Sequence, residues 1–461
     1  MSVPQTMTSL RQVAEWIGAD LHGADAHFDQ VSTDTRTLAP GALFVALVGE
    51  RFDGHGHLQA ALDAGAVGAL VANHQPDVSI PQLVVGDSLV GLQHLAHAWR
   101  QQFSLPVIGV TGSNGKTTVK QMLAAVLGTQ GSVLATEGNL NNHIGLPLTL
   151  LRLRAEHAYA VIEMGANHHG EIATLAAIAE PGIGIITQAG DAHLEGFGDR
   201  DGVARAKGEL FQHLGEGELA AINADDAYAD YWQHIAAPAA VLRFGFDASA
   251  QVRAEQVRVE AESSAFELLT PAGRASVLLP LPGKHNVSNA LAAAAAATAL
   301  GLDADSIAAG LASVRNVGGR LRWQTARLGA RVLDDSYNAN PTSLRAGLEL
   351  LAGLPGRRWL VLGGMGELGP DTEALHAQAG KDARELGIDQ LFTFGAQAAA
   401  AAGAFGVGAQ RFDDLDELVS VVEAELDASV VVLVKGSRAA RMERVVQALC
   451  ADTTGGSVHA V

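Results

Sequence analysis

Hydrophobic and polar positions alternate along this chain on the scale of whole secondary-structure elements. Short aliphatic runs end in polar or glycine-rich turns, and stretches with apolar residues at helical spacing follow them. This order recurs through most of the chain. Regular alternation of strands and helices predicts a parallel sheet covered by helices, with ligand-binding residues at the carboxyl ends of the strands. We therefore predict an α/β fold.

The length divides this pattern into three predicted domains. The chain has 461 residues, which is too long for one domain and fits about three. In residues 1–104, the pattern predicts a small α/β domain with a strand that ends near Leu47. Residues 105–318 predict a central domain built on a parallel sheet, and residues 319–461 predict a Rossmann-like domain of alternating strands and helices.

The clearest chemical motif lies in residues 105–127. An aliphatic strand, LPVIGV, runs into TGSNGKTT and then into a helical pattern. Glycines allow the loop N–H groups to face a phosphate at the helix N-terminus, a lysine adds charge, and a threonine hydroxyl can bind magnesium. Val110 stands where the full Walker pattern has glycine, but a chance glycine-rich turn does not explain this order. The predicted ATP-binding residues of the loop are Gly112, Ser113, Asn114, Gly115, Lys116, Thr117 and Thr118.

Three other polar residues of the central domain follow predicted strands or lie on a helix. Glu163 ends the strand in 159–172, where a carboxylate beside a phosphate loop suits a magnesium ligand; a capping or ion-paired glutamate is the alternative. His193 lies in the loop after the next strand, and Lys207 lies on a predicted helix among small residues that leave room around its amine. Taken alone, both side chains are more often simply solvated.

Asparagines mark two further stretches. Asn139, Asn141 and Asn142 either line a polar cleft or form an ordinary turn. Asn286 and Asn289 begin a long alanine-rich helix, where they can hydrogen-bond a purine edge. Asn286 can equally be the N-cap of that helix.

Basic residues lie in predicted turns at both ends of the chain. Arg36 can grip an anion with its fork of donors, although a solvated arginine is the simpler interpretation. The last predicted strand leads into a basic loop with Lys435, Ser437 and Arg438, which suits a carboxylate. The alternative is a helix start with two solvated cations. Pro341 is expected near the start of another helix in the third domain.

Composition narrows the setting. The net charge of −19 argues against nucleic acid as the main partner. A single cysteine, Cys450, excludes an internal disulfide framework and fits a reducing compartment. The N-terminal stretch predicts an amphipathic helix, and the longest apolar run, 291–300, is too short to span a bilayer. We expect a soluble cytoplasmic protein, and a monomer, with no membrane partner.

The motifs resemble those of the Mur ligases, the ATP-dependent ligases of peptidoglycan synthesis. TGSNGKTT is shared with a wider superfamily that includes folylpolyglutamate synthases. GNLNNHIGLPLTLL, AHLEGFG with AKGE, DSYNANPTSL and VKGSRAARME are more selective. They favour the branch that adds D-Ala-D-Ala, since the Asp-Asn-Pro-Arg signature of the diaminopimelate-adding branch is not present. The resemblance covers nearly the whole chain.

The resemblance implies a role for each matching residue. It assigns the uridine nucleotide of the substrate to Asp34, Thr35, Arg36, Asp53 and His55. It assigns catalysis to Lys116, Glu163, His193 and Lys207, magnesium binding to Thr117, Glu163, His193 and Lys207, and it implies that Lys207 is carbamylated. Further ATP contacts fall to Asn286, Asn289, Arg320 and Asp335, the last on the ribose. Lys435, Ser437 and Arg438 match the C-terminal substrate loop, whereas Thr187, Gln188 and Asp199 depart from the pattern.

The activity implied is amide-bond formation driven by ATP and Mg²⁺. The carboxylate of UDP-N-acetylmuramoyl-tripeptide would be phosphorylated to an acyl phosphate, and D-Ala-D-Ala would then displace the phosphate. The C-terminal domain would close over both substrates. Two alternatives are a different ligase of the same superfamily and a non-catalytic nucleotide-binding protein; the combination of Lys116, Glu163, His193 and Lys207 argues against the second.

Overall fold

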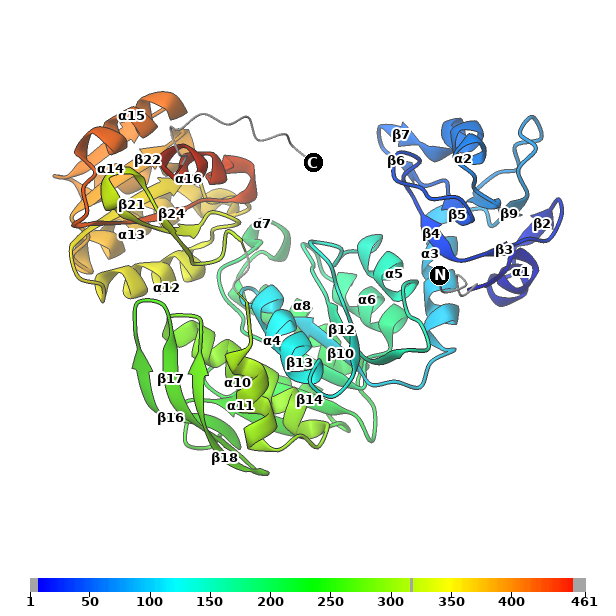
Figure 1. The fold of residues 1–461 in the computed structure, drawn as a ribbon, viewed down its shortest axis with the longest axis horizontal. Coiled ribbons are helices and arrows are strands. Elements are labelled where there is room, and N and C mark those ends of the chain that lie inside the picture. The colour runs from blue at the N-terminus through cyan, green and yellow to red at the C-terminus, as the bar shows by residue number, and fades with distance from the viewer. Residues whose placement is uncertain (1–6, 316–317, 451–461) are drawn as a thin grey trace.

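The computed structural model describes residues 7–315 and 318–450. Three sheets of five, nine and six strands follow one another along the chain, each covered by helices (Figure 1). The outermost parts of the first and third predicted domains, residues 1–6 and 451–461, lie outside the described residues. The predicted α/β fold is confirmed.

The N-terminal sheet has the order β2-β9-β8-β5-β4, with β2 antiparallel to its neighbour and the others parallel. The strand expected to end near Leu47 is β5, which ends at Val45. The sheet strands are β2 (Asp20–His22), β4 (Gln30–Ser32), β5 (Ala42–Val45), β8 (Gly68–Val71) and β9 (Gln82–Val84). Two short ribbons pair β1 (Thr8–Ser9) with β3 (His27–Phe28) and β6 (Val48–Gly49) with β7 (Phe52–Asp53). The helices are α1 (Leu10–Ile17), η1 (Gly54–His57), α2 (Leu58–Asp63) and α3 (Ser88–Arg100).

The central sheet has the order β11-β12-β10-β13-β14-β15-β16-β17-β18. It is parallel as far as β16 and then continues as an antiparallel arm. Its strands are β10 (Val107–Thr111), β11 (Ser132–Ala135), β12 (His157–Glu163), β13 (Ile183–Ile186), β14 (Leu219–Asn223), β15 (Ala240–Gly245), β16 (Val252–Val259), β17 (Ser264–Thr270) and β18 (Gly273–Leu279). Its helices are α4 (Lys116–Leu127), α5 (Gly145–Leu150), α6 (Glu171–Ala179), α7 (Leu194–Phe197), α8 (Arg200–His213), α9 (Ala229–Ile235), α10 (Lys284–Ala299) and α11 (Ala304–Ala312).

The alanine-rich helix α10 is the buried centre of this part of the chain. Every residue from Ala290 to Ala297 is fully buried, so no side of these two turns faces water. Helix α10 packs on α4 and on strands β14 to β17. A helix that is apolar all round is stable only when it is buried all round, and α10 therefore holds the helix of the phosphate loop against the sheet.

The C-terminal sheet has the order β19-β20-β24-β21-β22-β23 and is parallel except for the edge strand β19. Its strands are β19 (Arg322–Thr325), β20 (Arg331–Asp335), β21 (Arg357–Gly363), β22 (Gln390–Phe394), β23 (Ala409–Phe412) and β24 (Val430–Lys435). Its helices are η2 (Arg327–Gly329), α12 (Pro341–Ala352), η3 (Gly369–Asp371), α13 (Thr372–Glu385), η4 (Ala396–Ala398), α14 (Ala399–Phe405), α15 (Leu415–Glu425), η5 (Arg438–Ala440) and α16 (Glu443–Cys450). The expected helix start at Pro341 is confirmed.

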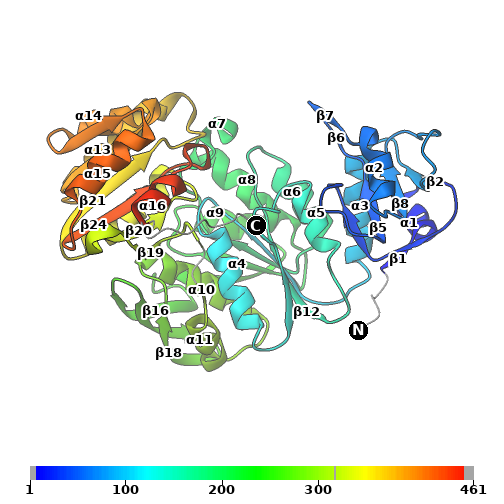
Figure 2. The ribbon, with the colours of Figure 1, turned by 45° about the horizontal axis from the view of Figure 1, so that its top comes forward.

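The nine-stranded sheet lies between the other two sheets, which are on opposite sides of it (Figures 1 and 2). Helix α3 joins the N-terminal part to the centre by packing on α5 and α6. The Trp99 indole N–H donates to Leu153 O at 3.2 Å, and Arg100 Nε donates to Ala179 O at 3.1 Å. Within residues 7–315 and 318–450, no helix has the length and apolar character needed to cross a membrane.

Candidate active site

A cleft of about 1470 Å³ lies between the central and C-terminal parts and reaches α3 on the N-terminal side. Loops at the carboxyl ends of β10, β12, β13 and β20 line it. Single small-molecule pockets are commonly about 300–1,000 Å³. This cleft therefore has room for more than one substrate.

The phosphate loop connects β10 to α4 and depends on its two glycines. Gly112 has φ 136° and Gly115 has φ 83°, and both lie where side chains cause strain. A Cβ on Gly112 would lie 2.0 Å from Thr187 Oγ1, and one on Gly115 would lie 2.2 Å from Asn289 Oδ1. Helix α4 has no side-chain cap, so its first N–H groups are available to an anion. Lys116 Nζ donates to Gly112 O at 2.6 Å, and burial lowers the pKa of this lysine.

Glu163 ends β12, the strand beside β10, and its carboxylate has three partners. It accepts hydrogen bonds from Thr117 Oγ1 at 3.0 Å and from Asn141 Nδ2 at 2.8 Å. Its third partner is Lys120 Nζ at 3.3 Å, on the next turn of α4 after Lys116. Sequence reasoning missed Lys120, although residues four apart on a helix share a face.

The three asparagines Asn139, Asn141 and Asn142 make different contacts. Asn141 orients Glu163, whereas Asn142 Oδ1 accepts the N–H groups of Ile144 and Gly145 at 3.2 and 2.8 Å and so closes a turn. Asn139, Asn141 and Asn142 all line the cleft. The polar-cleft interpretation therefore applies to all three asparagines, and Asn142 also forms a turn.

The oxygens of Thr117 and Glu163 fit a magnesium ion. Magnesium takes one or two protein oxygens together with phosphate and water oxygens, and these two side chains meet beside the phosphate loop. His193, also expected as a ligand, follows β13 with φ 55°, and its Nδ1 contacts the Glu367 carboxylate of the C-terminal part. Among the described residues, no three His, Cys, Asp or Glu side chains converge as a preformed metal site.

Lys207 lies on α8 and is not solvated, because its side chain is only 1% exposed. Its Nζ donates to Ala166 O at 3.2 Å and lies 5.0 Å from the centre of the Phe197 ring. Burial, and then the nearby Lys116 charge, lower its pKa to about 7. A lysine with this pKa is half neutral at pH 7, so it can act as a nucleophile.

Two small neighbours of Lys207, Ala204 and Gly208, lie against helix α9. Ala204 O accepts the Trp232 indole N–H at 3.0 Å, and a Cβ on Gly208 would lie 2.6 Å from Ile235 Cδ1. These small residues allow α9 to pack closely on α8. That the small neighbours also leave room around the Lys207 amine stays a prediction.

The two asparagines of α10 both line the cleft. Gly283 is the N-cap of α10, so the N-cap alternative for Asn286 is wrong. Asn286 Nδ2 donates to Pro282 O at 2.7 Å, and Asn289 Nδ2 donates to Asn286 Oδ1 at 3.3 Å. The neighbouring His285, which sequence reasoning missed, also lines the cleft, and burial lowers its pKa to about 4.

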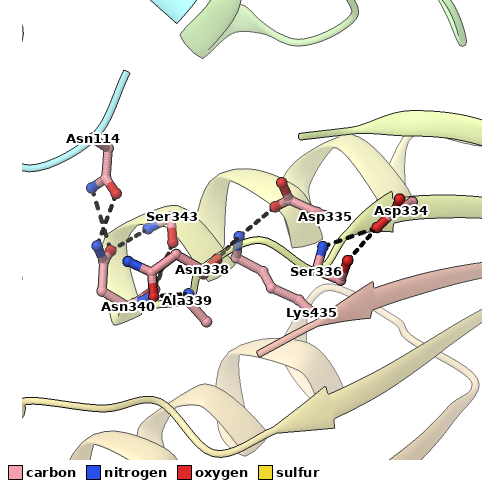
Figure 3. A network of polar contacts seen from close by, with 9 residues as sticks. All are labelled: Asn114, Asp334, Asp335, Ser336, Asn338, Ala339, Asn340, Ser343 and Lys435. Carbon is pink, nitrogen blue, oxygen red and sulfur yellow. Dashed lines mark hydrogen bonds and ion pairs between the residues drawn. The ribbon is translucent and has the colours of Figure 1, made fainter. Parts of the chain in front are cut away.

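Arg320 and Asp335 bring the C-terminal part to the cleft. Arg320 Nη2 donates to Thr117 Oγ1 at 3.1 Å, and its guanidinium lies 4.4 Å from the centre of the Tyr337 ring. Asp335 ends β20 and forms an ion pair with Lys435, its register partner at the end of β24 (Figure 3). Lys435 is 2% exposed and belongs to a strand. The prediction of a loop position and the alternative of a solvated cation are both wrong for it.

Ser437 and Arg438 line a second, smaller cavity together with His193 and Glu367. The Ser437 N–H donates to Gly364 O at 2.9 Å. Arg438 Nη1 donates to Glu443 Oε1 at 2.9 Å, and the Arg438 side chain is 66% exposed. The three residues expected in one substrate loop therefore divide between the two cavities, with Lys435 in the larger one.

The residues expected to hold a uridine nucleotide lie in the N-terminal part and do not line the cleft. Arg36 pairs with Asp34 at 2.6 Å and is 86% exposed, so its guanidinium is accessible. His55 Nδ1 lies 2.6 Å from Asp53 Oδ1, and the Ala72 N–H donates to His55 Nε2 at 3.0 Å. The whole set is Asp34, Thr35, Arg36, Asp53 and His55.

Comparisons with known proteins agree with this fold and show the family of the chain. Residues 110–297 match the Mur ligase middle domain, and residues 319–438 match the Mur ligase glutamate ligase domain. The chain belongs to the Mur ligase family. It is 46% identical to the UDP-N-acetylmuramoyl-tripeptide–D-alanyl-D-alanine ligase of Escherichia coli, over 96% of this chain and 98% of that protein. The corresponding Haemophilus influenzae ligase is 39% identical over 95% and 97% of the two chains.

Solved structures of MurF ligases have the same fold as this chain. A crystal structure of MurF from Acinetobacter baumannii superimposes with a TM-score of 0.92 at 35% identity, covering 97% of this chain and 100% of that one. MurF from Thermotoga maritima in complex with ADP superimposes with a TM-score of 0.82 at 28% identity, over 91% and 96% of the two chains.

Proposed function

We propose that this protein is an ATP-dependent ligase that joins D-Ala-D-Ala to UDP-N-acetylmuramoyl-tripeptide, the last cytoplasmic step in making the pentapeptide precursor of peptidoglycan. The observation that carries this proposal is the phosphate loop, with Lys116 and Thr117, opening into a cleft that the C-terminal part also lines. Near-complete coverage of relatives with this name supports the choice of substrates. We also expect a cytoplasmic monomer.

The reaction has two balanced steps. An oxygen of the tripeptide carboxylate attacks the γ-phosphorus of ATP, the bond to the bridging oxygen of ADP breaks, and an acyl phosphate forms. The D-Ala-D-Ala amine then attacks the acyl carbon, loses a proton, and phosphate leaves. Loop N–H groups and the Lys116 ammonium stabilise the charge on the transferring group, and the cleft positions the reactants. Thr117 and Glu163 would hold Mg²⁺, which supplies further charge neutralisation when bound.

Lys207 works as a carbamate in this proposal. The Lys207 ammonium first loses one proton, the neutral amine then attacks carbon dioxide to form a C–N bond, and a second proton is released, so that a cationic group becomes an anionic group with two oxygens. Burial of Lys207 and its pKa of about 7 support this step. Oxygen ligands are what magnesium prefers, and the change of sign removes a repulsion between the lysine and the ion.

We assign one substrate task to each predicted domain. Residues 1–104 hold the uridine nucleotide, residues 105–318 hold ATP, and residues 319–461 close over both. The carboxylate of D-Ala-D-Ala is assigned to the cavity with Ser437 and Arg438, because an exposed guanidinium can form a bidentate pair with a carboxylate. Asn286, Asn289, Arg320 and Asp335 are assigned to the adenosine side of ATP, with Asp335 on the ribose.

An acceptor panel tests the proposal. The protein is incubated with ATP, Mg²⁺ and UDP-N-acetylmuramoyl-tripeptide, with D-Ala-D-Ala, glutamate or diaminopimelate as the acceptor. ADP release is measured, and mass spectrometry identifies the product. Of the three acceptors, we expect only D-Ala-D-Ala to give a product, the pentapeptide. Tripeptides that end in diaminopimelate and in lysine are compared as the other substrate. Product with another acceptor would assign the chain to a different ligase activity, and no ATP turnover with any of them would overturn an enzymatic role.

A further inference from the structure

Two asparagine side chains join the phosphate loop to the C-terminal part of the molecule. Asn340 Nδ2 donates to Asn114 Oδ1 at 2.8 Å, and Asn114 Nδ2 donates back to Asn340 Oδ1 at 3.3 Å. Figure 3 shows the two amides facing each other across the gap between the ribbons. Each amide is both donor and acceptor, a reciprocal pattern that needs an amide on both sides.

Asn340 is held rigidly on its own side. It is the N-cap of α12, and its Oδ1 accepts the Ser343 N–H at 2.9 Å. Its own N–H donates to Ser343 Oγ at 3.1 Å, which completes a capping box, and the residue is only 6% exposed. Serine or aspartate caps a helix as well as asparagine does. Capping alone therefore does not require the amide nitrogen that reaches Asn114.

Asn114 is held on the other side at the tip of the phosphate loop. Its carbonyl oxygen accepts the Thr187 hydroxyl at 2.5 Å, and it lies between the two positive-φ glycines of the loop. A second connection runs in parallel, because Arg320 donates to Thr117 of the loop and stacks on Tyr337. Tyr337 and Asn340 belong to one short segment between β20 and α12. This segment thus contacts the phosphate loop at Asn114 directly and at Thr117 through Arg320.

We propose that Asn340 is a positioning residue that couples the shape of the phosphate loop to docking of the C-terminal domain, through its amide pair with Asn114. This inference rests on the proposed binding of ATP at the loop. Asn340 acts through Asn114 and does not touch the reacting atoms. The loop shape that binds phosphates also presents the Asn114 amide to Asn340, so ATP binding favours docking. By thermodynamic reciprocity, docking then strengthens ATP binding by the same factor.

Two substitutions separate this coupling from helix capping. Asn340→Ser keeps the N-cap but is too short to reach Asn114, and Asn114→Ser removes the other half of the pair without touching the cap. We expect each to lower kcat/KM for ATP about tenfold, with the thermal midpoint nearly unchanged. The double variant is expected to lose about tenfold as well, not about a hundredfold, because both changes break one interaction.

A matched control is Asp414→Ser, which exchanges the N-cap of α15. Asp414 lines neither cavity, so this variant should keep the ATP kinetics of the original protein. X-ray scattering supplies a readout that a purely structural role would not change. We expect a non-hydrolysable ATP analogue and the UDP-substrate to compact the original protein and the control more than either asparagine variant.

Losses that multiply to about a hundredfold in the double variant would overturn the coupling, and so would normal kinetics and compaction in Asn340→Ser. These results are distinguishable from failure of the proposed function. In that case the unmodified protein would itself show no ATP turnover with D-Ala-D-Ala and the UDP-tripeptide.

Discussion

Carbamylation of Lys207 is the most specific prediction, because the lowered pKa of this lysine gives both the fraction of neutral amine and the pH range in which the reaction occurs. An exposed lysine with a pKa of 10.5 is neutral in about one molecule in three thousand at pH 7. Lys207, with its pKa lowered to about 7 by burial, is neutral in about one in two. Because only the neutral amine attacks carbon dioxide, the fraction of reactive amine at pH 7 is roughly a thousandfold larger at this site than at a surface lysine.

Carbon-13 NMR with labelled bicarbonate measures the modification directly. We expect one carbamate signal, distinct from bicarbonate, in the intact protein. It should disappear in Lys207→Ala and remain in Lys381→Ala, which removes an exposed lysine on α13. The sign of the pH dependence follows from the lowered pKa. The signal and the turnover both fall as pH drops through about 7, because protonation then removes the nucleophile.

Activity supplies the second half of this test. Lys207→Ala should lose most turnover, and short carboxylic acids should restore part of it by supplying the missing oxygens. A variant that keeps its activity would remove Lys207 from the mechanism. An inactive variant that alkylamines rescue and carboxylates do not, together with no carbamate signal, would show that Lys207 acts as an ammonium.

Four further predictions concern the other parts of the site. Lys116→Ala should lower phosphoryl transfer about a hundredfold or more while circular dichroism shows a folded protein, since this lysine neutralises charge in the cleft; near-normal turnover would exclude it. Arg36→Ala should raise KM for the UDP-substrate about tenfold and leave KM for ATP unchanged; an equal rise in both would contradict the assignment of the N-terminal domain. Scattering should show a more compact particle with an ATP analogue and the UDP-substrate, whereas an unchanged radius would indicate a preformed closed site. Gly112→Ala should weaken ATP binding and lower the free energy of unfolding by about 1–3 kcal/mol, because its Cβ would meet Thr187; normal ATP titration and urea unfolding would refute this.

Local signals carried much of the fold and part of the site. The phosphate loop was predictable because its strand, glycines and helix are consecutive, and each acts on the backbone within a few residues. The start of α12 at Pro341 was predictable for the same reason. Antiparallel β16, β17 and β18 were not predicted, since pairing between strands is decided by partners elsewhere in the chain.

Only the tertiary structure decided which polar side chains are buried and which residues they contact. Lys207 and Lys435 look like ordinary solvated cations in the sequence, but packing of whole elements around them buries both. Lys120 becomes a partner of Glu163 only because α4 lies across the end of β12. Asn114 and Asn340 are 226 positions apart, and two domains must dock before their amides meet. Local sequence patterns identify candidate functional residues. The protonation states, contacts and couplings of these residues depend on long-range packing, which no local pattern encodes.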